Sequence, residues 1–151
     1  MRKKICLILA ICWMVIIFSF SAREAKLSAR DSASVGTLIG RILIPGFNDW
    51  DKEKQEAFAD KVDHPVRKTA HATEYAVLGF LIAGSFSDGT KRRRVSVGIP
   101  WLAGTVYAIS DEIHQFFVPG RSCQVSDMAL DSTGVLIGVL VAQLLWYRRR
   151  P

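Results

Sequence analysis

Apolar residues along the chain gather in four blocks and do not recur at the period of a soluble helix or strand. The blocks cover about residues 5–20, 69–86, 95–110 and 128–147. At ~1.5 Å per residue, a helix over each block is long enough, or nearly so, to cross a hydrocarbon core of ~30 Å. No block alternates as a barrel strand would. The pattern therefore predicts an all-α, polytopic membrane protein with one domain over residues 1–151 and a bundle of four transmembrane helices.

The first block has a second interpretation, because a secretory signal peptide also begins with basic residues and an apolar run. The stretch Ser19-Phe20-Ser21 has the small-x-small pattern of a cleavage site. Against cleavage, the block is longer than the usual ~7–15 residues of a signal peptide's apolar region, and Trp13 and Phe18 make it bulky. We expect a retained helix, with cleavage as the alternative.

Two further helices are predicted in the polar stretch between the first and second blocks. In one of them, apolar residues recur at i, i+3, i+4, i+7 and i+8, the pattern of an amphipathic helix: Val35, Leu38, Ile39, Ile42 and Leu43. This helix should end at Pro45-Gly46, and either lie along the outer surface of the membrane or pack as a lid on the bundle. A polar helix should follow Asn48-Asp49 and stop at His64-Pro65, since proline disrupts a helix interior.

Charge predicts the orientation of the spans. The net charge is +6 over 151 residues, of which 50% are hydrophobic. The basic residues cluster at the ends of the apolar blocks, at 2–4, 91–94 and 148–150. With four spans every cluster falls on one side, which predicts a multi-pass protein of the plasma membrane with both termini cytoplasmic. No basic stripe interleaved with aromatic residues is present, so we expect membrane lipids as partners and not nucleic acid.

The three cysteines indicate no metal site. Cys6 and Cys12 lie within the first apolar block, and Cys123 has no second cysteine near it in the sequence. The paired spacing of a structural zinc site is therefore missing, and no cofactor is predicted.

Ionisable side chains within the predicted spans mark a candidate site, because each costs about 2.5–3.5 kcal/mol to insert. In this topology they lie at the outer ends of three spans and in the loop between the third and fourth. His71, Glu74 and Tyr75, for example, share one helix face at positions i, i+3 and i+4. The candidate ligand-binding layer comprises Arg67, His71, Glu74, Tyr75, Asp111, Glu112, Gln115, Arg121, Asp127 and Asp131.

The alternative for each of these residues is a polar helix end near the lipid headgroups. Asp127, for example, stands where a helix dipole favours a negative charge. Glu74 and Asp131 fit this alternative least, since both lie well inside apolar sequence. Gly134 and Gly138 continue the face of Asp127 and Asp131, and they predict that the fourth helix packs closely on its neighbours.

The spacing of the polar residues resembles that of the VanZ-like family. The resemblance extends over nearly the whole chain and is carried by Arg67-Lys68-x-x-His71-x-x-Glu74-Tyr75, Asp111-Glu112-x-x-Gln115-x-x-x-Pro119-Gly120-Arg121 and Asp127-x-x-x-Asp131-x-x-Gly134. It implies a membrane protein of the cell envelope, linked with reduced susceptibility to the glycopeptide teicoplanin. It implies no catalytic residue and no substrate.

Three functions are compatible with these residues. In a binding or gating module, Arg67 and Arg121 would contact an anionic lipid-linked cell-wall precursor or a glycopeptide. The acids of the third and fourth spans would position these arginines or accept hydrogen bonds from the ligand: Asp111, Glu112, Asp127 and Asp131. In a metal-assisted hydrolase or transferase acting on a lipid phosphate, the same carboxylates would suit Mg²⁺ or Mn²⁺. In a purely structural network, the charges would only hold the bundle together. We expect the first, and therefore a binding protein without catalytic residues.

Overall fold

The structure, a computed structural model, describes residues 1–86 and 97–147. It is all-α, as predicted, and the described residues contain no strand. The helices are α1 (Arg2–Ser21), α2 (Ala25–Leu43), the short 3-10 helix η1 (Phe47–Asp49), α3 (Lys52–Phe86), α4 (Gly98–Gln115) and α5 (Val125–Tyr147). The basic clusters predicted at 91–94 and 148–150 lie outside the described residues.

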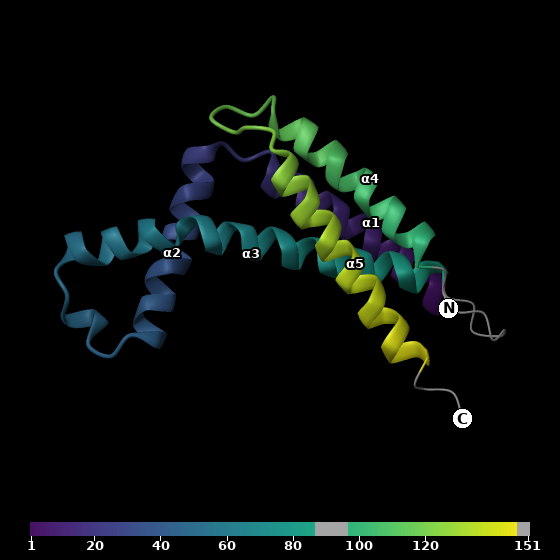
Figure 1. Ribbon diagram of the computed structural model, residues 1–151, viewed down its shortest axis with the longest axis horizontal. Helices are drawn as coiled ribbons and strands as arrows, with labels where there is room; N and C mark the ends of the chain where they lie inside the picture. The colour runs from purple at the N-terminus through teal and green to yellow at the C-terminus, as the bar shows by residue number, and fades with distance from the viewer. Residues whose placement is uncertain (87–96, 148–151) are drawn as a thin grey trace.

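The molecule consists of a bundle and an arm (Figure 1). The bundle contains α1, α4, α5 and the second half of α3, and its successive helices alternate in direction. The arm contains α2, η1 and the first half of α3, and it extends from the end of the bundle at which α1 and α4 end and α5 begins. Two described helices are long and apolar enough to cross a membrane by length and composition, α1 and Val125–Leu145 of α5.

Partly buried hydrogen bonds attach α1 to the rest of the bundle. The Trp13 indole Nε1 donates to the Glu74 carbonyl oxygen on α3 at 2.8 Å, and the Tyr107 hydroxyl on α4 donates to the Met14 carbonyl oxygen at 2.7 Å. The opposite surface of α1 is apolar and exposed, with Ile8 and Val15 among its residues. Such a surface suits a lipid environment, because lipid chains solvate apolar side chains without cost.

Small residues bring α3 and α5 together. A Cβ atom added at Gly138 would lie 1.8 Å from the Ala76 carbonyl oxygen, and one added at Gly134 would lie 2.5 Å from the Ala72 carbonyl oxygen. The predicted close packing of this glycine face is therefore confirmed. The core beside it includes Tyr75, which is fully buried.

Helix α3 runs unbroken through Pro65, and the prediction that a helix stops at His64-Pro65 was wrong. Pro65 is exposed, so the backbone hydrogen bond that it cannot make is lost on the surface and not in the core. Arg67 pairs with Asp63 one turn earlier, which bridges the proline. Helix α2 packs beside this region, where Ser32 Oγ donates to Asp63 Oδ1. Tertiary contacts thus override the local preference of proline.

The predicted amphipathic helix is α2, although it begins ten residues before its first stripe residue, Val35. Its face of small residues, Ser32, Gly36 and Gly40, is buried: Ser32 and Gly36 pack on α3, and Gly40 packs on the Phe47 ring of η1. The apolar stripe points elsewhere: Leu38 is 55% exposed and Ile42 is 71% exposed. A lid would bury this stripe, so the exposure favours the alternative of a helix at the membrane surface.

Candidate functional site

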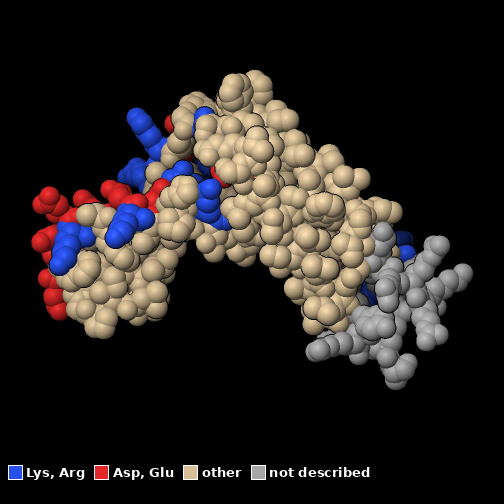
Figure 2. All heavy atoms as spheres, in the orientation of Figure 1, with Lys and Arg blue, Asp and Glu red and all other residues tan. Residues whose placement is uncertain are grey.

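Charged side chains gather over the arm and around its junction with the bundle, whereas the visible surface of the bundle carries few (Figure 2). Two cavities lie at this junction. The first, here called the arm cavity, has a volume of about 170 Å³ and lies between the end of α1, α2 and α3. The second, here called the loop cavity, has a volume of about 150 Å³ and lies between α3, α4 and the loop before α5. Arg67, His71 and Arg121 line both cavities and form the wall between them.

The two cavities differ in the chemistry of their remaining walls. Apolar residues contribute to the arm cavity from three helices: Phe20, Val35, Val66 and Ala70. The loop cavity is lined mainly by polar residues, which include Lys68, Glu112, Gln115, Gln124 and Asp127. The shared basic wall therefore has a partly apolar space on one side and a polar space on the other.

A chain of hydrogen bonds runs from α1 through α4 to the loop. Ser21 Oγ donates to Asp111 Oδ2 at 2.6 Å, and Gln115 Nε2 donates to the same oxygen at 3.2 Å. Gln115 Oε1 in turn accepts a 3.4 Å bond from Arg121 Nη1. The chain thus links the buried end of α1 to the guanidinium that separates the two cavities.

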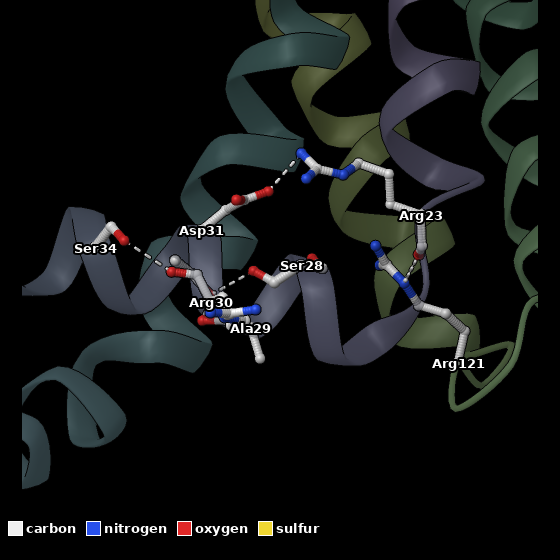
Figure 3. Close-up of polar contacts among 8 residues, drawn as sticks. Arg23, Ser28, Ala29, Arg30, Asp31, Ser34 and Arg121 are labelled. Carbon is white, nitrogen blue, oxygen red and sulfur yellow. Dashed lines mark hydrogen bonds and ion pairs between the residues drawn. The ribbon is translucent and has the colours of Figure 1, made fainter.

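Arg121 also joins the loop to the turn between α1 and α2. Its Nε donates to the Arg23 carbonyl oxygen at 3.3 Å, and Arg23 Nη1 lies 2.5 Å from Asp31 Oδ2 on α2 (Figure 3). The Ala25 amide completes this junction by donating to the Pro119 carbonyl oxygen at 3.3 Å. Both groups that accept hydrogen bonds from Arg121, the Gln115 side chain and the Arg23 carbonyl oxygen, are therefore neutral.

The acids of α4 and α5 do not hold the arginines, which corrects one sequence-based expectation. Glu112 Oε1 accepts a 2.7 Å hydrogen bond from the backbone N–H of Gln124, and Asp127 Oδ1 lies 3.2 Å from Lys68 Nζ. Arg67 pairs with Asp63, a residue outside the predicted layer. Arg121 makes no ion pair with any carboxylate in the part of the chain that the structure describes. Glu112 and Asp127 are thus occupied by groups on the loop and on α3, whereas Asp111 reaches Arg121 only through Gln115.

The ten predicted residues lie in one region but at two depths. Those that line a cavity are Arg67, His71, Glu74, Glu112, Gln115, Arg121 and Asp127. Behind them lie Tyr75, Asp111 and Asp131, which are at most 3% exposed and line neither cavity. The Tyr75 hydroxyl and Asp131 Oδ1 have no hydrogen-bond partner among the described residues. Asp111 is connected to the shared wall through Gln115, whereas Tyr75 and Asp131 lie deeper in the bundle.

Ser21, Arg23 and Lys68 are among the residues of this region that lay outside the layer predicted from the sequence. Lys68 adjoins Arg67, and the basic pair itself could have indicated it. Ser21 ends the first apolar block at the depth of the other polar residues, which was its only signal. Arg23 is one of many charged residues in a polar stretch and carries no signal of its own.

The shared wall contains the like charges of Arg67 and Arg121, of which Arg67 is paired with Asp63. Nearby carboxylates, those of Asp111, Glu112 and Glu74, favour the charged form of Arg121. Burial, and after it the nearby Arg67 guanidinium, lower the pKa of Arg121. Arginine nevertheless stays protonated in proteins, so two positive charges remain close together across the wall. Among the described residues, no group of three or more His, Cys, Asp or Glu side chains is placed to hold a metal ion.

Comparisons with known proteins place the chain in a family. A family model described as VanZ/LLP1 matches residues 6–146, which include nearly all of the bundle and the whole arm. No curated protein and no solved structure matches the chain. Because the family match covers nearly all of the 151 residues, the chain belongs to the VanZ/LLP1 family of membrane proteins.

Proposed function

We propose that this protein is a binding module of the cell envelope, in which Arg67 and Arg121 together receive an anionic group of an envelope ligand. The observation that carries the proposal is the shared wall: the two guanidinium groups line the same two cavities, and Arg121 has no carboxylate partner among the described residues. Arginine binds phosphate and carboxylate through paired hydrogen bonds, which makes it suitable for this role.

The energetics of the wall favour an anion. A partly buried guanidinium has lost part of its hydration, and this cost is offset only when an opposite charge or a set of hydrogen bonds replaces the water. Arg121 receives only neutral acceptors, from Gln115 and the Arg23 backbone. An anion between Arg67 and Arg121 would supply the missing charge and would reduce their mutual repulsion.

The membrane topology that we propose has four spans, formed by α1, the second half of α3, α4 and α5, with both termini cytoplasmic. It is supported by the alternating directions of these helices in the bundle (Figure 1). In this topology the two cavities lie at the outer surface of the plasma membrane. The ligand would then be a lipid-linked cell-wall precursor or a glycopeptide, and binding would alter susceptibility to teicoplanin.

The proposal is tested by complementation in a host from which the gene has been deleted. Teicoplanin susceptibility is measured after restoring the wild-type protein, Arg121→Ala, Arg121→Lys or the control Arg41→Ala. Arg41 is an exposed basic residue in the last turn of α2 and lines neither cavity. We expect the wild type and the control to restore the reduced teicoplanin susceptibility fully, Arg121→Lys partly, and Arg121→Ala not at all.

Two results would contradict this function. One is a deletion that leaves teicoplanin susceptibility unchanged, and the other is full restoration by Arg121→Ala. A purely structural role of Arg121 makes a different prediction, because the variant would then accumulate less in the membrane. The amount of each variant in isolated membranes, measured by immunoblot, therefore accompanies every susceptibility value.

A further inference from the structure

We infer that the ligand is an amphiphilic phosphate, whose phosphoryl head lies between Arg67 and Arg121 and whose single hydrocarbon chain passes through the arm cavity into the surrounding lipid. This inference rests on the proposed function and specifies its ligand. It depends on the contrast between the two cavities, on the surface to which the arm cavity leads, and on the donors at the shared wall.

The arm cavity can accept a hydrocarbon chain. Phe20 from α1, Val35 from α2, and Val66 and Ala70 from α3 contribute apolar surface to it. The loop cavity, in contrast, is lined mainly by side chains that need hydrogen-bond partners or water. A chain that left the head through the loop cavity would desolvate these groups, so the arm cavity is the less costly path.

The apolar wall of the arm cavity continues onto the exposed surface of the protein. Val35 lines the cavity and also belongs to the exposed stripe of α2, where it is 45% exposed. Phe20 lines the cavity from the other side and is 51% exposed. A chain that leaves between these two residues would meet the apolar stripe of α2, which is placed to contact lipid.

The shared wall offers hydrogen-bonding groups that no described residue uses. Arg67 Nε and His71 Nδ1 are both buried and have no hydrogen-bond partner among the described residues. Both belong to residues that line the two cavities, next to Arg121. A phosphoryl group provides several acceptor oxygens, which would match an arginine N–H and the N–H of one histidine tautomer once these buried groups turn toward the cavity.

The charges around the arm cavity also suit an anionic head. Its wall contains three arginines, Arg23, Arg67 and Arg121, against two carboxylates, Asp31 and Glu74. Arg23 and Asp31 neutralise each other as an ion pair near the turn between α1 and α2. Arg67 is likewise paired with Asp63, so Arg121 is the cation of this wall that has no ion-pair partner among the described residues. Arg121 is therefore the charge that would attract the head, and Glu74 is the charge that opposes it.

The hydrocarbon chain of the ligand increases affinity without adding hydrophobic energy, because it is as well solvated in lipid as in the cavity. Its effect is to confine the head to the membrane surface, and tethering of this kind raises apparent affinity by about 10²–10⁴-fold. A phosphate with a chain should therefore bind at least roughly 100-fold more tightly than a phosphate without one.

The experiment uses the full-length protein in phosphatidylcholine nanodiscs and isothermal titration calorimetry. The probes are hexadecyl phosphate and inorganic phosphate, and empty nanodiscs provide the correction for partitioning into lipid. Arg121→Gln removes the anion contact, and Ala70→Trp fills the apolar side of the arm cavity. Ala57→Trp is the matched control, since Ala57 is an exposed alanine of α3 that lines neither cavity.

We expect Arg121→Gln to weaken binding of both probes by about tenfold or more, the effect of losing charge-assisted hydrogen bonds. Ala70→Trp should weaken hexadecyl phosphate by a similar factor and leave inorganic phosphate unchanged, and Ala57→Trp should change neither. The inference is overturned if Ala70→Trp has no effect on hexadecyl phosphate while Arg121→Gln still weakens both probes, a result that leaves the proposed function standing. If Arg121→Gln changes neither affinity, the proposed function itself fails.

Discussion

Ser21, the last residue of α1, donates a 2.6 Å hydrogen bond to Asp111 Oδ2 on α4, a residue 90 positions later in the chain. Both side chains are buried, and Gln115 Nε2 donates to both the serine and the carboxylate oxygen. The bond fixes the end of α1 against α4, and the turn that follows presents the Arg23 carbonyl oxygen to Arg121. A hydroxyl without charge thus helps to position the guanidinium at the shared wall.

Replacing Ser21 with alanine should destabilise the bundle by about 1–3 kcal/mol, because a buried carboxylate oxygen then loses its shortest hydrogen bond. The measurement is unfolding of the purified protein in mixed micelles with a rising fraction of sodium dodecyl sulfate. Ser19→Ala is the matched control, since the exposed Ser19 bonds only to the Val15 carbonyl oxygen of its own helix. Equal stability of the two variants would show that the bond to Asp111 is not important.

The depth of the site could be predicted from the sequence because insertion of charge into lipid is costly. Glu74 and Asp131 interrupt apolar sequence. Because inserting an ionisable side chain into lipid costs free energy, such a residue is expected to have a partner or a function. Ser21 could not be found in this way, since serine is inexpensive to insert and common in membrane helices. The sequence thus indicates where charges lie but not which neutral groups orient them.

The partner of Arg67 was missed for a related reason. Asp63 lies one turn before Arg67, and the pair is an ordinary i,i+4 contact once the helix is continuous. The sequence places Pro65 between them and predicts a break, so the contact could not be expected. The packing of α2 against α3 supports the continuous helix, and that packing depends on residues far away in the sequence.

The ion pair between Lys68 and Asp127 should contribute less than about 1 kcal/mol to stability. Its side chains are 35% and 32% exposed, so water and salt screen the interaction. A double-mutant cycle with Lys68→Ala and Asp127→Ala, measured by the same unfolding method, gives the coupling energy directly. The coupling should decrease further at high salt. A coupling of several kcal/mol that does not respond to salt would instead indicate that the pair is essential to the fold.

The exposed stripe of α2 should contact lipid in the membrane. A nitroxide attached at Leu38→Cys, in a background in which the three native cysteines are replaced, should be more accessible to oxygen than to a water-soluble nickel reagent. The matched control is Arg30→Cys, because Arg30 is exposed on the same helix but does not belong to the stripe. Electron paramagnetic resonance measures both accessibilities in phosphatidylcholine vesicles. Similar values at the two positions would mean that α2 lies in water and does not reach the membrane surface.

Adding a single methyl group at Gly138 should disrupt the contact between α3 and α5. In Gly138→Ala the new Cβ would meet the Ala76 carbonyl oxygen at 1.8 Å, and this backbone atom cannot move without shifting α3. We expect a loss of about 3 kcal/mol or more, at the upper end of what overpacking costs, and poor accumulation in the membrane. Ile137→Ala is the control, since Ile137 is 53% exposed and its shortening leaves the interface intact. If Gly138→Ala unfolds at the same sodium dodecyl sulfate fraction as the wild type, the two helices are farther apart than the structure places them.

Because the same two helices carry His71 and Asp127 to the cavities, a partly folded Gly138→Ala should also lose affinity for hexadecyl phosphate, whereas Ile137→Ala should keep it.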